Sequence, residues 1–110
     1  MLQPWGKEPA EKDMVLNAAE PFVQQVDILD PETKEPFVPP DGSEVYFLLG
    51  PKPYTRWDGV LTGAVGRFKI PAAQTEVITK NTVVRFYISH PDGGDQLPYM
   101  LTRGKVIRND

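Results

Sequence analysis

Hydrophobic and polar residues alternate along much of this chain, and the alternation predicts β-strands. In Glu44–Leu49 the side chains of Val45, Phe47 and Leu49 fall on one face. Because successive side chains of a strand point to opposite faces, this segment is expected to bury that face. The same period-two pattern occurs in three further segments: Phe22–Leu29, Gly66–Ile70 and Thr82–Ser89. In Phe22–Leu29 the residues Phe22, Val26 and Ile28 share one face, on which Gln24 is the polar exception.

Weaker patterns extend the set of expected elements. Met14–Asn17 and Tyr54–Leu61 are predicted to be strands, and Phe37–Pro40 to be extended. Ala72–Ile78 is the one stretch that could form a helical turn or two. Pro98–Arg108 is the predicted closing strand, with one of two sets facing inward: Tyr99, Leu101 and Ile107, or Met100 and Val106. Gly104 is expected to mark a bulge between its two halves.

Turn signals separate these segments at intervals of about 8–12 residues, which is typical of an antiparallel sandwich. Pro91–Gly94 is the strongest hairpin signal, because its glycines accept the positive φ angles of tight turns. The predicted fold is therefore all-β: an antiparallel, Ig-like β-sandwich of about seven short strands over residues 14–110. Residues 1–13 are expected to form an extended N-terminal arm. The arm is either a floppy terminus or a segment that docks on a neighbour through Trp5.

Composition narrows the class of protein. The 110 residues fit one domain. The 12 prolines and 9 glycines indicate many turns and few helices. A net charge of −3 makes nucleic acid an unlikely main partner. The absence of cysteine fits synthesis in a reducing cytoplasm. No apolar run approaches the roughly 20 residues of a membrane helix, and the N-terminus lacks a signal peptide, so we expect no membrane partner.

Catalytic chemistry is poorly supported. His90 is the only histidine, and its place before Pro91 is typical of a solvated loop histidine. Ser43 or Ser89 could form a serine–histidine pair with it on paper. Neither serine lies in a G-x-S-x-G turn, and Ser89 and His90 point to opposite faces of their strand. The expected catalytic set is therefore none, and the protein is expected not to be an enzyme.

Metal and cofactor sites are also not expected. Asp92-Gly93-Gly94-Asp95 carries two carboxylates in a glycine turn, but it lacks the alternating carboxylates and the distal glutamate of a calcium loop. A plain hairpin turn is the favoured interpretation. Without cysteine, a zinc site built around the single histidine is nearly excluded.

Two clusters suggest binding surfaces. Tyr54 and Arg56 flank Trp57, and these residue types dominate the binding energy of protein interfaces. The favoured interpretation of Trp57 itself is that it belongs to the core. The closing strand carries three basic residues on an acidic chain: Arg103, Lys105 and Arg108. They either protect an edge strand from unwanted pairing or dock an acidic partner, and both interpretations stay open.

Several phrases of the sequence resemble the β-sandwich domain of tailed-bacteriophage virion proteins. The resemblance covers most of the chain. It rests on P-F-V-Q-Q-V-D-I-L-D (Pro21–Asp30), D-G-S-E-V-Y-F-L-L (Asp41–Leu49), W-D-G-V-L-T-G (Trp57–Gly63), G-R-F-K-I-P (Gly66–Pro71), R-F-Y-I-S-H-P-D-G-G (Arg85–Gly94) and T-R-G-K-V-I-R (Thr102–Arg108). The similar domains are the N-terminal domain of siphophage upper-baseplate proteins and small head proteins of actinobacterial phages. The family offers no catalytic residues to transfer.

The resemblance implies a structural protein of the virion. Baseplate members continue into a long C-terminal region and this sequence does not, so a standalone minor capsid or decoration protein docked on the major capsid protein is expected. The alternatives are a baseplate or tail module, and a carbohydrate-binding module that uses Tyr54, Trp57 and Tyr99. The expected partner-binding residues are Trp5, Tyr54, Arg56, Arg103, Lys105 and Arg108. Self-association on the virion stays open.

Overall fold

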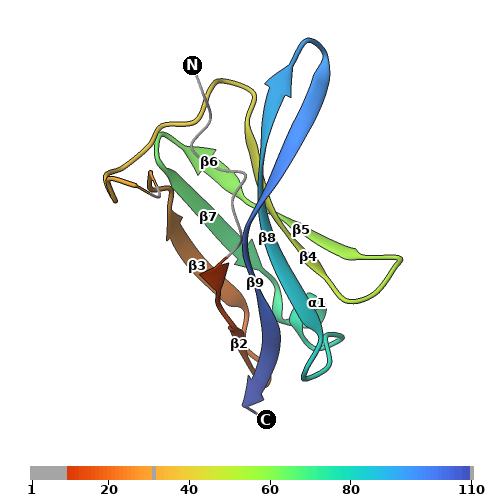
Figure 1. Ribbon diagram of the computed structural model, residues 1–110. Helices are drawn as coiled ribbons and strands as arrows, with labels where there is room; N and C mark the ends of the chain where they lie inside the picture. Colours follow the sequence, from red (N-terminus) through yellow and green to blue (C-terminus); the bar gives the residue numbers. More distant parts are fainter. Residues whose placement is uncertain (1–9, 31, 110) are drawn as a thin grey trace.

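The computed structural model describes residues 10–30 and 32–109 and forms two facing β-sheets (Figure 1). One short helix, α1 (Ala72–Thr75), interrupts the strands. The strands are β1 (Ala10–Glu11), β2 (Met14–Asn17), β3 (Phe22–Asp27), β4 (Glu44–Leu49), β5 (Thr55–Asp58), β6 (Val60–Thr62), β7 (Val65–Ile70), β8 (Val83–Asp92) and β9 (Asp95–Asn109). The predicted all-β sandwich is confirmed.

The larger sheet has six strands, in the order β1-β9-β8-β4-β5 with β2 also paired to β9. The smaller sheet has the order β3-β7-β6. Most pairs are antiparallel as expected, but β1 and β2 run parallel to β9. Parallel pairing of the two ends of a chain is a non-local contact, and no local pattern of residues encodes it. Part of the expected N-terminal arm is thus a strand of the sheet, and residues 1–9 lie outside the described part.

The predicted strand over Tyr54–Leu61 is two strands that belong to different sheets. β5 pairs with β4 in the larger sheet, and β6 pairs with β7 in the smaller one. Gly59 lies at the crossing, and its N–H donates to the carbonyl of Val45 at 3.0 Å. A Cβ at Gly59 would lie 2.7 Å from the ring of Phe68. Glycine therefore allows the chain to cross against the core at this point.

Aromatic rings from both sheets fill the space between them. The ring of Phe47 lies 4.6 Å from that of Phe68 and 5.0 Å from that of Phe86, measured between centroids. Phe22 packs against Phe47 at 6.0 Å and against Trp57 at 5.9 Å. Trp57 is only 2% exposed, so its predicted place in the core is confirmed. Such tilted and edge-on ring pairs stabilise a core beyond the area that they bury.

Strands β8 and β9 form a long hairpin that extends beyond the rest of the sandwich (Figure 1). The sequence pattern places the end of one strand at Ser89 and the start of the next at Pro98. Pairing instead continues to the turn at Gly93 and Gly94, whose φ angles are 58° and 97°. The hairpin expected at this turn is confirmed.

A bulge at Leu101 resolves which residues of β9 face inward. Phe86 is the partner of Thr102 and Tyr87 is the partner of Met100, so Leu101 is the extra residue. The bulge shifts the alternation of β9 by one residue. Tyr99 and Leu101, from one of the two expected inward sets, and Val106, from the other, therefore all pack on the core. The bulge of the β8/β9 pair is therefore not at Gly104.

Gly104 has another structural role. The chain between β1 and β2 crosses β9 there, and a Cβ at Gly104 would collide with the carbonyl of Lys12. Asp13 completes the crossing, because its Oδ1 accepts the backbone N–H of Lys105 at 3.0 Å. Lys105 lies between the residues of β9 that pair with β1 and those that pair with β2, and the Asp13 side chain provides the acceptor for its N–H there.

The loop regions differ from expectation mainly in length. The helical segment is a single turn, shorter than the predicted Ala72–Ile78. Phe37–Pro40 is irregular, with an isolated bridge between Leu29 and Pro36 just before it.

Within residues 10–30 and 32–109, no helix is long and apolar enough to cross a membrane.

Candidate interaction surface

The face of the larger sheet that points away from the core is rich in arginine and tyrosine. Val45, Phe47 and Leu49 of β4 are buried, so the intervening residues of β4 and their cross-strand partners point outward. We call this the outer face. Its residues considered below are Glu44, Tyr46, Arg56, Asp58, Val83, Arg85, Tyr87, Arg103 and Lys105.

Two stacked tyrosines lie at the centre of the outer face. The rings of Tyr46 and Tyr87 are 5.4 Å apart and nearly parallel, at 14°. The guanidinium carbon of Arg56 lies 3.8 Å from the centroid of the Tyr46 ring, a cation–π contact. Burial raises the pKa of Tyr46 above its ordinary value, although the Arg56 charge acts in the opposite direction. The stack is thus a rigid, neutral platform with a cation laid across it.

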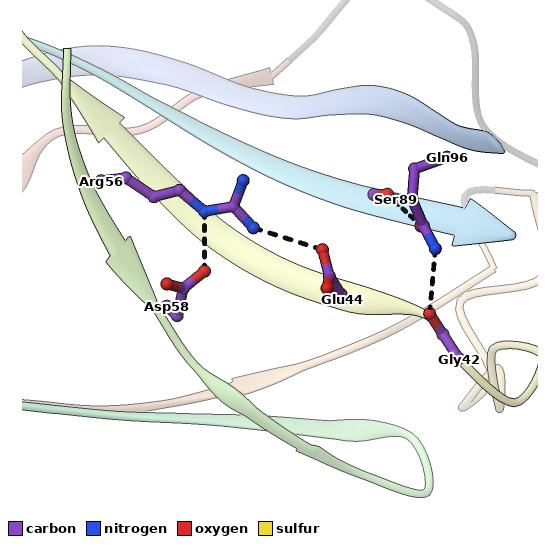
Figure 2. Close-up of polar contacts among 6 residues, drawn as sticks. All are labelled: Gly42, Glu44, Arg56, Asp58, Ser89 and Gln96. Carbon is purple, nitrogen blue, oxygen red and sulfur yellow. Dashed lines mark hydrogen bonds and ion pairs between the residues drawn. The ribbon is translucent and has the colours of Figure 1, made fainter.

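Two carboxylates hold Arg56 in that position, as Figure 2 shows. Its Nε donates to Asp58 Oδ1 at 2.7 Å, and its Nη2 donates to Glu44 Oε2 at 3.2 Å. Burial acts to lower the pKa of Arg56, but the bonds to Asp58 and Glu44 outweigh it and the pKa is raised. All three side chains are substantially exposed, so these pairs contribute little stability and mainly orient the guanidinium.

The other predicted binding residues are placed differently. Tyr54 is 39% exposed, and the guanidinium of Arg85 lies 5.6 Å from its ring. Arg103 and Lys105 are exposed on the outer face of β9. Trp5 lies outside the described residues. Edge protection by Arg103 is the wrong interpretation, because β1 pairs with the other side of β9 at this residue.

Arg108 does not join Arg103 and Lys105 as an exposed basic group. Its half-buried guanidinium donates from Nη1 to the carbonyl of Thr75 at 2.8 Å and to that of Ile78 at 2.9 Å. These bonds attach the segment after α1 to the end of β9. Its geometry is that of a structural clamp.

His90 is not the solvated loop residue that the sequence suggested. It lies in β8 and is 2% exposed, because β8 continues past Ser89 and places position 90 on the inner face. Its Nδ1 is 2.9 Å from Oγ of Ser43. That hydroxyl donates its single proton to the carbonyl of Pro40 at 2.6 Å, so Nδ1–H of His90 is the donor to Ser43. Burial lowers the pKa of His90, which favours this neutral form.

This geometry does not activate Ser43 as a nucleophile, because the imidazole donates to the hydroxyl and does not accept from it. Ser89 is buried as well, and it bonds to the side chain of Gln96, which in turn reaches the carbonyl of Gly42 (Figure 2). Both serines therefore hold the loop before β4 against the β8/β9 hairpin. Among the described residues, no group of three or more His, Cys, Asp or Glu side chains gathers in a way that could hold a metal.

A family model of LtfC-like β-sandwich domains matches residues 8–109. The chain belongs to this family. Among solved structures, the LtfC-like domain is similar to the N-terminal domain of ORF48 of phage TP901-1, with a TM-score of 0.60 and 14% sequence identity. The similarity covers 94% of this chain and 91% of the other. The resemblance to tailed-phage β-sandwich domains is confirmed as a likeness of fold. No curated protein matches the sequence.

The aromatic residues of the LtfC-like domain do not form a carbohydrate platform. Trp57 is buried in the core. Tyr99 is half-buried, packs on the core and lies 5.7 Å from the ring of His90. Of the three residues expected in that alternative, only Tyr54 is exposed. Sugar stacking needs exposed rings, so the described geometry counts against this alternative.

Arg85 is the residue of the outer face that sequence reasoning missed. Its position on the polar side of β8 was evident from the alternation, but its neighbours were not. Only the strand register shows that it lies opposite Arg103. Gln24, the polar exception on the inner face of β3, lines a small cavity of about 40 Å³ whose other lining residues are mostly apolar and include Phe47 and Phe86.

Proposed function

We propose that this LtfC-like domain is a non-enzymatic structural module of a bacteriophage virion that acts by docking on other virion proteins. The observation that carries the proposal is the fold likeness, over nearly the whole chain, to a domain of a phage protein. The outer face supports it, because tyrosine and arginine that do not serve the core are the residue types that interfaces use.

For the place in the virion, we put a baseplate or tail position first and the capsid shell second. From the sequence we expected the reverse. The solved domain is by its name an N-terminal domain, hence part of a larger phage protein. A module of that kind is what the resemblance to upper-baseplate proteins implies.

The mechanism is docking by a preformed surface. Strands β4, β5 and β8 of the larger sheet and the bonds to Asp58 and Glu44 hold the tyrosine stack and Arg56 in place, so little side-chain entropy is lost when a partner binds. Repeated copies on a symmetric particle convert a modest affinity for each site into stable attachment. Neither step requires a catalytic residue, and the Ser43–His90 pair is assigned to structure because its hydrogen-bond direction is wrong for nucleophile activation.

The test is to locate the protein on intact virions of the phage that encodes it, with a specific antibody and electron microscopy. Label at the tail tip supports the baseplate position. Label over the head supports the capsid position and overturns our order of preference. Absence of the protein from purified virions, checked by mass spectrometry of the same particles, would overturn the proposed function altogether.

A further inference from the structure

Three cationic side chains gather on the outer face where β8 meets β9. Arg85 and Arg103 are direct cross-strand partners. Lys105, two residues beyond Arg103, is the partner of Val83 on the same face. Side chains of direct partners begin about 4.5–5.5 Å apart, and diagonal neighbours are about 7–8 Å apart. We call Arg85, Arg103 and Lys105 the cationic cluster.

Among the described residues, no carboxylate forms an ion pair with the cationic cluster. Among the described residues no ion pair involves Arg85, Arg103 or Lys105, whereas Arg56 in the same row of the sheet has two carboxylate partners. Glu11 is the register partner of Arg103 on β1, yet the two form no ion pair. Like charges placed opposite each other destabilise a sheet. The cluster is therefore expected to cost the sheet stability, and an anion bound there would offset that cost.

Arg85 adds a second, independent observation. Its Nη1 is buried and has no hydrogen-bond acceptor among the described residues. The ring of Tyr54 lies on one side, 5.6 Å from the guanidinium carbon. Arg85 as a whole is half-buried, so its charge is only partly hydrated and favours an anion on the outer face.

We propose that the cationic cluster binds an extended, acidic segment of a partner virion protein, with carboxylates at alternate positions running along β9. Arg103 and Lys105 are separated by one residue on a strand, hence by about 6.5 Å on one face. Alternate side chains of an extended peptide have the same spacing. Guanidinium groups bind carboxylates through paired hydrogen bonds. Arg85 lies beside Arg103, so both arginines can bind the carboxylate at that position of the peptide. This inference rests on the proposed function, which makes the partner a virion protein, and it adds that the bound segment of that partner is acidic.

An acidic peptide fits better than nucleic acid. The whole chain carries a net charge of −3, which repels a long polyanion. A short carboxylate segment is affected mainly by nearby charges, because charges beyond about 10 Å are screened at moderate salt. The cluster spans two strands, which is the width of a single peptide.

The probe is a fluorescein-labelled decapeptide of alternating glutamate and threonine, titrated with the full chain and followed by fluorescence anisotropy. The test variant is Arg103→Gln/Lys105→Gln. The matched control is Arg67→Gln/Lys69→Gln, which removes the same two residue types at the same spacing from exposed positions of β7 in the other sheet. We expect about tenfold or greater weakening in the test variant and no change in the control. Glu11→Gln should tighten binding, since it removes a competing carboxylate.

Several results would overturn the inference. One is equal weakening in both double variants, which indicates attraction to total charge only. Another is unchanged binding of a peptide in which glutamine replaces glutamate. Tighter binding of a thymidine oligonucleotide, or self-association abolished by the test variant, would assign the cluster to a different occupant. A urea titration of each variant confirms folding, and Arg103→Gln should not lower stability. These results are distinguishable from failure of the proposed function, because that failure is detected as absence of the protein from purified virions.

Discussion

The Oγ atom of Ser43 lies 2.9 Å from Nδ1 of His90, and the bond joins the loop before β4 to the inner face of β8. The Ser43 hydroxyl donates a hydrogen bond to the carbonyl oxygen of Pro40. His90 therefore donates to Ser43, and Ser43 in turn donates to a backbone carbonyl. The imidazole is 2% exposed. A protonated, charged His90 would lose hydration at this position, so acid is expected to destabilise the protein through this residue.

The first prediction concerns pH. In the unfolded chain His90 takes up a proton near its ordinary pKa of about 6.5, whereas burial lowers the pKa in the folded state. The unfolded state therefore binds more protons as the pH falls through this value, and the free energy of unfolding decreases from pH 7.5 toward pH 5.5. One proton sets an upper limit of about 1.4 kcal/mol per pH unit. Urea unfolding at a series of pH values measures the slope.

The control for this prediction is His90→Asn, which keeps a side-chain donor near Ser43 but does not titrate. His90 is the only histidine of the chain, so the slope between pH 7.5 and 5.5 should largely disappear in the variant. A wild-type protein that is equally stable at both ends of this range would contradict the prediction.

The second prediction separates the basic residues of β9. Arg108→Met removes the donor to the carbonyls of Thr75 and Ile78, and we expect a loss of about 1–3 kcal/mol in the free energy of unfolding. Arg103→Met removes an exposed charge that lies opposite Arg85, and stability should stay within about 0.5 kcal/mol. Chemical unfolding of the two variants side by side tests this. Equal losses would show that Arg108 is not a clamp.

The third prediction concerns the crossing between the sheets. Gly59→Ala places a methyl group 2.7 Å from the ring of Phe68, and the overpacking should lower the free energy of unfolding by about 1–3 kcal/mol. Gly63→Ala is the comparison, because it has open space around it and only its φ of +57° is unfavourable. Thermal unfolding should show the larger decrease for Gly59→Ala. The opposite order would mean that the crossing adapts easily.

The fourth prediction concerns the passage from β1 to β2. Gly104→Ala drives a methyl group into the carbonyl of Lys12, so this segment must move away from β9. The bond from the Lys105 N–H to Asp13 should then break. Amide hydrogen exchange should become faster at Lys105 and in β2, while exchange in the β4/β8 pair changes little. Unchanged protection of the Lys105 amide would contradict this account.

Alternation of apolar and polar residues predicted most elements well. The bounds of β2 and β4 agree residue by residue with the predicted segments. The predicted strands were too short at the β8/β9 hairpin. Pro91 and Pro98 are not strand ends, because the outer part of the hairpin extends beyond β4 and a missing N–H can be tolerated where no third strand pairs.

The candidate surface was partly predictable. Tyr54, Arg56, Arg103 and Lys105 were singled out by residue type, and all four lie exposed on or beside the outer face. The role of Arg108 was not visible, because the carbonyls that it binds belong to a loop about thirty residues earlier in the chain. Arg85 was overlooked for a similar reason: an arginine on a polar strand face has no distinctive meaning until its cross-strand neighbour is known.

The sequence by itself determined the all-β class, the burial of Trp57 and the hairpin at Gly93 and Gly94, because these follow from local alternation and turn chemistry. Tertiary structure alone decided the parallel pairing of β1 and β2 with β9, the division of one predicted strand at Gly59, the burial of His90 and the opposition of Arg85 and Arg103. Each of these depends on which distant strands are neighbours and in what register. A period of two residues is the same whichever strand lies alongside, so the pattern cannot encode that choice.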